Sequence, residues 1–270
     1  MNLAVVYMVA GLSSRFGGKI KQFAQVGPSN ETLIEYSLKQ ALAAGFNKIV
    51  FIVGNKTEQP FKEKFGDSFN GVPVLYAYQN FDSLKRDRPW GTCDAVCAVK
   101  GVIDCPFVVC NGDDLYGVKV FKELCDHLKN NKEAATIGYK LDVVLPESGT
   151  VNRGIFEIDE NNNVKTIVEA FDISKADLKD QKPTDHCSMN IFALHPETLS
   201  YLTAKLELFK EQNKGDRKIE CLIQNKLTEL IKEGKLVIKL YPTSEPWIGV
   251  TNPEDEVKVK SYLLEESRKI

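Results

Sequence analysis

Short apolar runs alternate with longer amphipathic segments through the first half of the chain. The apolar runs are rich in Val, Ile and aromatic residues and have the length of buried strands. They cover residues 3–9, 48–53, 73–78 and 106–110. Between them, helical spacing recurs at 32–45, 92–102 and 118–128. This alternation predicts an α/β fold, with right-handed crossovers and a parallel sheet covered by helices on both faces.

One of these helices has clear signals at both ends. Thr32 and Glu35 form a capping-box pattern in the sequence Thr-Leu-Ile-Glu, and apolar residues then recur on one face. Gly45 follows the last of them, at the position where glycine commonly ends a helix.

The pattern changes at about residue 134, where shorter apolar stretches are joined by polar turns. The expected strands cover residues 135–141, 154–158, 164–170 and 188–194. We interpret them as antiparallel additions to the sheet. Two amphipathic helices, a strand at 236–240 and a charged helix after Pro253 complete the pattern. The clearer of the two amphipathic helices has its apolar face at Ile219, Leu222, Ile223, Leu227, Leu230 and Ile231.

The chain contains no internal repeat, low-complexity tract or linker. We therefore predict a single domain over residues 1–270, with two halves at 1–133 and 134–270 that differ in their strand pattern. The 35 Lys and Arg residues nearly balance 37 Asp and Glu, so no overall field attracts nucleic acid or a membrane surface.

Cysteine and histidine usage narrows the possible chemistry further. Seven cysteines without a Cys-x-x-Cys spacing indicate reduced, mostly buried thiols and a cytoplasmic location. The three histidines lie in unrelated contexts, which argues against a histidine-based metal site or catalytic triad. No apolar run approaches the length of a membrane span, and the first apolar run lacks the basic leader of a secretory signal.

The first apolar run ends at Ala10-Gly11, where a loop of small and basic residues begins. This loop carries Arg15, a glycine pair and Lys21, so its backbone N–H groups and cations form a candidate phosphate site. Ser13 and Ile20 stand where a P-loop requires Gly and Ser or Thr, and the dinucleotide fingerprint GxGxxG is absent. A simple glycine-rich turn is the alternative interpretation.

Two further segments lie where strands of the predicted sheet end. Asn111-Gly112-Asp113-Asp114 follows a buried run, and two carboxylates beside a phosphate loop can hold Mg²⁺. Solvated acids in an ordinary turn are the alternative. Gln79 and Gly91-Thr92 offer amide and backbone groups that can recognise a base edge, or they form an exposed side chain and a helix cap.

In this order, the segments resemble the sugar-1-phosphate nucleotidyltransferases, also called nucleoside-diphosphate-sugar pyrophosphorylases. The matching pattern is Ala-Gly-Leu-Ser-Ser-Arg with a following Lys, then Gln and Gly-Thr, then Gly-Asp, and finally Gly, Glu and Asn, and it covers nearly the whole chain. Among these enzymes the chain looks most like the uridylyltransferases for N-acetylglucosamine 1-phosphate and glucose 1-phosphate. The resemblance implies a Rossmann-like mixed, mostly parallel sheet, and the formation of an NDP-sugar and pyrophosphate from an NTP and a sugar 1-phosphate with Mg²⁺.

The resemblance also implies a role for each matching residue. It implies that Arg15 and Lys21 hold the pyrophosphate leaving group and that Asp113 binds Mg²⁺. Nucleotide contacts are implied for Ala10, Gly11, Leu12, Ser13, Gln79, Gly91 and Thr92. Sugar contacts are implied for Gly154, Glu169 and Asn190. The resemblance thereby makes residues 1–133 the nucleotide-binding half and residues 134–270 the sugar-binding half.

The sequence departs from the family pattern at three places. Ser13 replaces a glycine of the first loop, and Gly249 stands where the family usually has a second metal-binding aspartate. Ala170 and Phe171 stand where a lysine commonly follows the sugar-binding glutamate.

The implied reaction is an in-line attack of the sugar phosphate on the α-phosphorus of the NTP, which needs no protein nucleophile. UTP with N-acetylglucosamine 1-phosphate is the first choice of substrates, and glucose 1-phosphate is the next. At 270 residues, a single activity is expected, without the acetyltransferase half of bifunctional bacterial relatives. Alternatives are a cytidylyltransferase for a phosphorylated alcohol, and a non-catalytic homologue that binds a nucleotide sugar.

Overall fold

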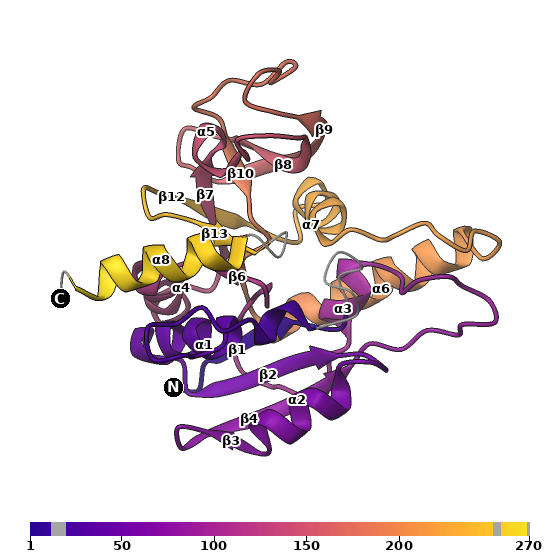
Figure 1. Cartoon of the computed structure of the whole chain (residues 1–270). Helices are drawn as coiled ribbons and strands as arrows, with labels where there is room; N and C mark the ends of the chain where they lie inside the picture. Colours follow the sequence, from indigo (N-terminus) through magenta and orange to yellow (C-terminus); the bar gives the residue numbers. More distant parts are fainter. Residues whose placement is uncertain (12–19, 251–254, 269–270) are drawn as a thin grey trace.

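The computed structural model of this chain describes residues 1–11, 20–250 and 255–268 (Figure 1). Eleven strands in these residues form one sheet, in the order β3-β4-β2-β1-β5-β11-β7-β10-β8-β9, with β12 paired to β7. The first half of the chain contributes a parallel core of four strands, with β3 (Ser68–Phe69) antiparallel at its edge. These four strands are β1 (Ala4–Met8), β2 (Lys48–Val53), β4 (Val72–Tyr78) and β5 (Phe107–Asn111).

The second half extends this sheet with strands that are mostly antiparallel to their neighbours. They are β7 (Ala134–Lys140), β8 (Val151–Ile158), β9 (Val164–Ile173), β10 (His186–Ser188) and β11 (Phe192–Leu194). The later strand β12 (Ile238–Thr243) instead runs parallel to β7. Two short strands, β6 (Asp114–Leu115) and β13 (Ile248–Gly249), pair separately. The predicted mixed sheet is therefore confirmed.

The stretch 188–194, predicted as one strand, is divided into β10 and β11. Asn190 lies between them with φ of 55°, in the left-handed region, so the strand is interrupted there. The helix predicted at 92–102 is also shorter than expected: α3 (Thr92–Cys97) ends early, and turns continue to Ile103.

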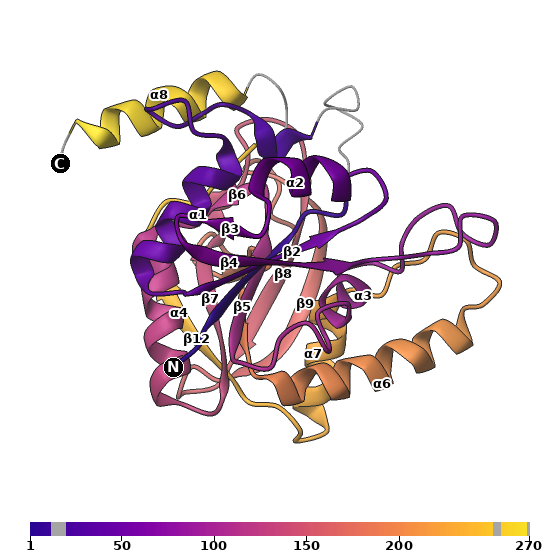
Figure 2. The same ribbon diagram turned by 90° about the horizontal axis from the view of Figure 1, so that it is seen from below.

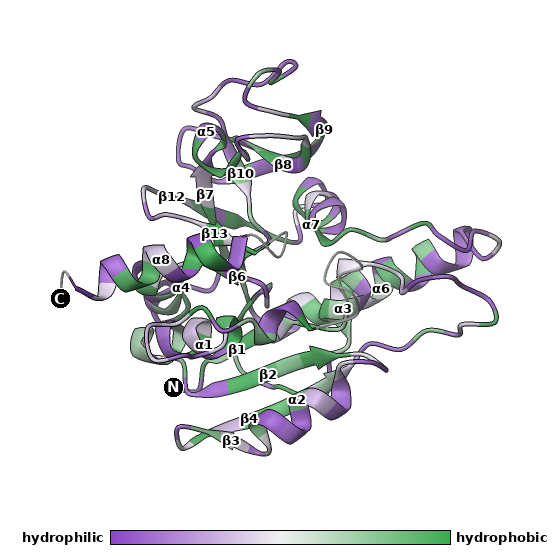
Figure 3. Ribbon diagram, viewed as in Figure 1, coloured by the Kyte–Doolittle hydropathy of each residue, from purple (hydrophilic) through white to green (hydrophobic). Residues whose placement is uncertain are grey.

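Helices cover both faces of the sheet, as the alternating pattern predicts (Figure 2). On one face, α1 (Leu33–Ala44), α2 (Glu58–Phe65) and α4 (Val118–Asn130) contribute to one buried cluster. On the other face, α3, α6 (Pro196–Gln212) and α7 (Ile223–Lys232) form a second cluster. The central strands are hydrophobic over most of their length (Figure 3), and each large side chain buried there contributes about 1.5–3 kcal/mol.

Three shorter or peripheral helices complete the fold: η2 (Lys21–Phe23), a single 3-10 turn, α5 (Leu141–Val144) and α8 (Asp255–Ser267). A small third cluster of apolar side chains, including Leu33, Leu115 and Val259, attaches α8 to α1 and β6. No helix among the described residues is long and apolar enough to cross a bilayer. All seven cysteines are free thiols, and six of them are buried, as expected from their sequence contexts.

Local signals determine where α1 lies. The Thr32 side chain and the Glu35 side chain each bond to the other residue's backbone N–H, so both halves of the predicted capping box form. Gly45 ends the helix with φ of 110°, a conformation that favours glycine. The helix connects β1 to β2, and this crossover makes the two strands parallel.

Candidate active site

The predicted acidic segment lies where β5 ends, beside the end of β1. The backbone N–H of Gly112 donates to the Met8 carbonyl at 3.2 Å. A Cβ atom at Gly112 would lie 2.3 Å from a methyl group of Val9, so only glycine fits this close approach. The glycine therefore brings Asp113 next to the loop that follows β1.

Asp113 forms an ion pair with Lys21, the first residue of η2. Both side chains are partly exposed, at 23% for Asp113 and 19% for Lys21, so a ligand can reach them. The sequence placed these two residues on the same edge of the sheet, and the structure brings them into contact. Ala10 and Gly11 lie in the same loop, and Ala10 packs near Gly54 at the end of β2. Leu12, Ser13 and Arg15 lie outside the described residues.

Asp114 lies behind this ion pair and is 4% exposed. The Asn111 side-chain amide donates to its Oδ2 at 2.9 Å, and the Tyr116 hydroxyl stands 3.2 Å from the same oxygen. Burial and the neighbouring charge of Asp113 raise the pKa of Asp114 to about 7. A carboxyl group with this pKa changes its charge near neutral pH, or when a cation arrives beside it.

The acidic pair fits Mg²⁺ in its ligand chemistry. Among the described residues, no group of three or more His, Cys, Asp or Glu residues forms a metal-binding cluster. Mg²⁺ commonly uses one or two carboxylates and takes its other ligands from water and phosphate. Asp113 is the accessible carboxylate, and burial, followed by the neighbouring charge of Asp113, raises the pKa of Asp114, so a divalent cation beside the pair would favour its ionised form.

Gly249, the position of the missing second aspartate, lies opposite Asp114 in the β6–β13 pair. A Cβ atom there would stand 3.0 Å from Asp114 Oδ1 and 2.5 Å from the ring of Trp247. The Trp247 ring thus occupies the space that a side chain at position 249 would need. In this conformation a carboxylate fits at position 249 only if the tryptophan moves.

Gln79 and the Gly91-Thr92 segment lie together at the end of β4. The Gln79 side-chain nitrogen donates to the Gly91 carbonyl at 3.0 Å and to Asp94 Oδ2 at 2.9 Å. Because a carboxylate only accepts hydrogen bonds, this pairing orients the Gln79 amide and leaves its oxygen for another donor. The Thr92 hydroxyl accepts a bond at 2.9 Å from the backbone N–H of Ile223, the first residue of α7.

The three predicted sugar-binding residues come together around Gln224 of α7. Gly154 on β8 is aligned with Glu169 on β9, and a Cβ atom on Gly154 would lie 3.1 Å from the Gln224 amide. Gln224 donates to the Asn190 side-chain oxygen at 2.8 Å. Burial raises the pKa of Glu169, and its Oε2 is buried without a hydrogen-bond partner. A carboxylate oxygen without a partner can accept a hydrogen bond from a ligand rich in hydroxyl groups.

Two residues of this region were not predicted from the sequence. Gln224 begins the polar run Gln224-Asn225-Lys226 of α7, where one more polar residue carries no signal by itself. Arg153 precedes Gly154 and is the cross-strand partner of Ala170, the position where the resemblance places a lysine. Only the register of two strands reveals that an arginine faces this position. The sequence signal that could have found it is a lone cation beside the predicted sugar-binding glycine.

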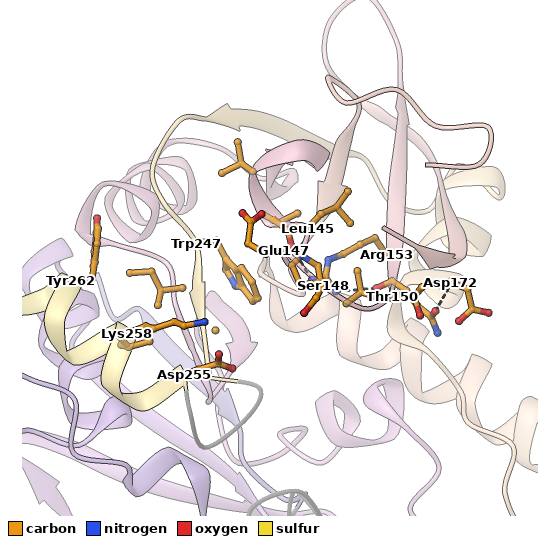
Figure 4. A pocket seen from close by; sticks show the side chains of 18 residues that line it. Leu145, Glu147, Ser148, Thr150, Arg153, Asp172, Trp247, Asp255, Lys258 and Tyr262 are labelled. Carbon is orange, nitrogen blue, oxygen red and sulfur yellow. Dashed lines mark hydrogen bonds between the residues drawn. The ribbon is translucent and has the colours of Figure 1, made fainter. Parts of the chain in front are cut away.

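Arg153 lines a cavity of about 1060 Å³ between the 143–153 segment, β13 and α8 (Figure 4). Its guanidinium carbon lies 5.6 Å from the centre of the Trp247 ring. Gly249 lines the same cavity and also adjoins Asp114, so one residue separates the cavity from the acidic pair, which does not itself line it. The lining further includes Glu147, Asp172 and Lys258.

Fold and site together define a protein that brings an acidic pair, a lysine and a polar sheet extension to one edge of an α/β sheet. The chain belongs to the nucleotidyl transferase family, whose model matches residues 18–266. The resemblance drawn from the sequence is thus confirmed at the level of the family.

Two curated relatives show how far the likeness extends. Mannose-1-phosphate guanyltransferase of Yarrowia lipolytica is 24% identical over 249 residues, which cover 81% of this chain and 61% of that protein. Bifunctional protein GlmU of Staphylococcus saprophyticus is also 24% identical over 249 residues, covering 91% of this chain and 49% of GlmU. The chain therefore spans about half to three fifths of the length of these relatives.

Solved structures share the fold over nearly the whole chain. A Bacillus anthracis protein described as a glucose-1-phosphate thymidylyltransferase, solved with sucrose, matches with a TM-score of 0.70 and 14% identity. That match covers 97% of this chain and 96% of the other. UDP-glucose pyrophosphorylase with UDP-glucose matches with a TM-score of 0.68 and 16% identity, covering 98% and 100%. The expected nucleotide-diphospho-sugar transferase type of fold is confirmed.

Proposed function

We propose that this chain transfers a nucleotidyl group from an NTP, with UTP as the first choice, to a sugar 1-phosphate. N-acetylglucosamine 1-phosphate is the first choice of acceptor, and glucose 1-phosphate is the next. The observation that carries the proposal is the Lys21–Asp113 pair at the sheet edge, with Gly154, Glu169 and Asn190 gathered on the sheet extension. This arrangement offers charge for phosphates on one side and hydrogen bonds for a sugar on the other.

The orientation of Gln79 supports a choice among the bases. Its side-chain nitrogen is bonded to Gly91 and Asp94, so its oxygen is the group left to meet a base. The ring N–H of uracil, thymine or guanine can donate to such an oxygen. Cytosine and adenine present a ring nitrogen acceptor at the corresponding place, which an oxygen repels. This argues against the cytidylyltransferase alternative. The relatives are named for guanosine, thymidine and uridine nucleotides, which agrees with this preference.

The proposed chemistry rests on positioning and charge neutralisation. An oxygen of the sugar phosphate attacks the α-phosphorus in line with the departing pyrophosphate, and no residue of the chain has to form a covalent bond. Lys21, together with Arg15, would neutralise the pyrophosphate as it leaves, and Glu169 would hold sugar hydroxyls. Asp113, with Asp114 behind it, would hold Mg²⁺, which when bound neutralises phosphate charge.

Pyrophosphate release tests the proposal directly. Four NTPs would be combined with the 1-phosphates of glucose, N-acetylglucosamine and mannose, and with choline phosphate, in the presence of Mg²⁺. We expect the strongest release from UTP with N-acetylglucosamine 1-phosphate. Release with CTP and choline phosphate would favour the alternative enzyme instead. A folded chain that binds an NDP-sugar without turnover in any combination would be a binding homologue.

Two variants connect the activity to the acidic segment. Asp113→Ala should lower turnover by about a hundredfold or more, because losing one preorganised charge contact costs about 2.7–4 kcal/mol in comparable sites. Asp104→Ala is the matched control, because its carboxylate is 94% exposed on a surface turn. Equal activity in the two variants would remove Asp113 from the mechanism. Arg15→Ala is expected to lose activity to a similar extent.

A further inference from the structure

Arg153 is a partly buried cation whose hydrogen bonds are incomplete. Its Nη1 donates to the carbonyl of the preceding residue, Asn152, at 3.0 Å, and its Nη2 donates to the Val144 carbonyl at 3.2 Å. Its Nε is buried and has no partner. Within the described part of the chain, Arg153 forms no ion pair with a carboxylate. Burial lowers the pKa of Arg153, whereas Asp114 and Glu169 are near enough to raise it, but neither is bonded to it, so its guanidinium keeps a donor free for a ligand.

Another unfilled polar atom lies near this arginine. Oε2 of Glu169 is also buried without a hydrogen-bond partner, and the Trp247 indole N–H is directed toward Asp114, whose pKa it lowers. Glu169 lies on β9, the strand that pairs with the strand of Arg153, and the Trp247 ring stands beside the guanidinium. Among the described residues, atoms of this kind also occur at Gln22 and His195, so their presence alone does not mark a site, and the inference depends on the cavity beside Arg153.

The cavity gives a ligand access to this arginine. Arg153 and Lys258 approach the Trp247 ring from different sides of the cavity (Figure 4). The lining residue Gly249 adjoins Asp114, and Asp114 acts electrostatically on Arg153, so an anion held by Arg153 would lie near the acidic pair. Lys21 stands on the other side of that pair, in the loop after β1. The two cations therefore serve different halves of the site.

We infer that Arg153 binds the phosphate group of the sugar 1-phosphate, an inference that rests on the proposed function. A guanidinium group presents paired N–H donors that match two phosphate oxygens, and it stays charged when buried. Its place on β8, with Ala170 of β9 as its cross-strand partner on the same face, assigns it to the sugar half of the chain rather than to the triphosphate. The Trp247 ring would keep the guanidinium plane in position through a cation–π contact.

Steady-state kinetics separate the two substrates. Arg153→Gln should raise the KM for the sugar 1-phosphate by about 10- to 100-fold, the range for losing hydrogen bonds to a charged group. The KM for the NTP should stay within about twofold of the wild-type value, because the triphosphate does not contact this residue. Arg153→Lys keeps the charge but not the paired donors, so its KM for the sugar 1-phosphate should lie between those of the wild type and Arg153→Gln.

The kinetic experiment has a matched control variant, and two outcomes would overturn the inference. Lys165→Gln removes one positive charge from an exposed position of the same β8–β9 hairpin and should leave both KM values unchanged. An unchanged KM for the sugar 1-phosphate in Arg153→Gln would overturn the inference. A rise confined to the NTP would overturn it as well, by assigning Arg153 to the triphosphate.

A binding measurement tests Arg153 independently of turnover. Inorganic phosphate and glucose 1-phosphate would be titrated separately into the wild-type chain while tryptophan fluorescence is followed. A saturable change that disappears in both Trp247→Phe and Arg153→Gln would support the inference, even if no substrate pair gives turnover and the proposed function fails. A change that persists in Arg153→Gln, or no change with either ligand, would overturn the inference. Circular dichroism would show that each variant is folded, and Arg153→Lys replaces Arg153→Gln if the latter is not.

Discussion

Two arginines of this chain each lie against a tryptophan, but their surroundings differ. Arg86 stacks on Trp90, with its guanidinium carbon 3.4 Å from the ring centre, and Arg153 lies 5.6 Å from the Trp247 ring centre. Arg86 donates from all three nitrogens to carbonyls of Arg88, Asp216 and Ile219. Arg153 leaves a buried Nε without a partner. Arg86 is 4% exposed and fully bonded, whereas Arg153 is only partly buried and keeps a donor without a partner, as expected of a ligand-binding residue.

Two buried aspartates differ in the same way. Asp94, on the side of Arg86, accepts from the Gln79 amide and pairs with Lys210 at 3.0 Å. Asp114, on the side of the cavity, has no ion pair among the described residues, and its pKa is raised to about 7. We call the first region the closed arm, meaning residues 84–94 and 216–223, which lie side by side in Figure 1. Most polar groups of the closed arm form hydrogen bonds or ion pairs with one another, whereas the cavity region contains polar groups without such partners.

The largest expected effect tests the contrast between the arginines. Arg86→Gln should lower the free energy of unfolding by about 3 kcal/mol, because it removes charge-assisted bonds and leaves buried carbonyls without donors. Arg153→Gln should lower the free energy of unfolding by less than about 0.5 kcal/mol, or should raise it, because the substitution removes a charge that has no ion-pair partner among the described residues. Urea denaturation of both variants measures the difference. Equal losses would show that Arg153 is as structural as Arg86.

A second variant tests how tightly the closed arm is packed. Gly91 has φ of 96°, and a Cβ atom there would lie 2.8 Å from the Cys221 carbonyl oxygen. Gly91→Ala should therefore lower the free energy of unfolding by about 2 kcal/mol through backbone strain and this contact. Thermal and urea unfolding would measure the loss, with Gly101→Ala as a control that shares a positive φ but has open space around it. Equal losses in both would show that the contact with Cys221 adds nothing.

Much of this arrangement follows from local sequence signals. The capping box at Thr32 and the glycine at 45 predicted α1, and the apolar run at 48–53 matches β2. The rule that ligands bind at strand ends brought Lys21 and Asp113 to one edge, where the structure pairs them. These predictions succeed because each depends on neighbours in the chain or on a general property of parallel sheets.

Other features depend on contacts between distant segments and carry no local signal. The interruption at Asn190 lies inside an apolar stretch, so the period of hydrophobic residues continues across it. Gln79 meets Asp94 and Gln224 meets Asn190 only after the helices have packed on the sheet. Whether Arg153 is paired or unpaired is likewise decided by β9, β13 and the 143–153 segment together. The roles assigned to these residues in binding remain predictions.

The aspartates provide a test that depends on pH. The folded-state pKa of Asp114, about 7, exceeds the unfolded value of about 3.9, so the ionised carboxylate destabilises the folded chain. Wild-type stability should fall between about pH 4 and pH 7, by up to about 1.4 kcal/mol for each pH unit. In urea denaturation without divalent metal, Asp114→Asn should be no more stable than the wild type near pH 4. Its gain in free energy of unfolding over the wild type should be complete above pH 7. Asp94→Asn should instead destabilise the chain at neutral pH, because it breaks the pair with Lys210.

The smallest expected effect concerns Thr92, where a predicted nucleotide contact and a helix cap coincide. Thr92→Val keeps the size of the side chain but removes the oxygen that accepts the Ile223 N–H, so the free energy of unfolding should fall by about 1 kcal/mol. Thr92→Ser keeps the oxygen and serves as the control. If the hydroxyl only caps α7, both variants should bind the NTP with the wild-type KM. A raised KM in Thr92→Val, restored in Thr92→Ser, would show that the same hydroxyl also contacts the nucleotide, and the closed arm would then extend into the site.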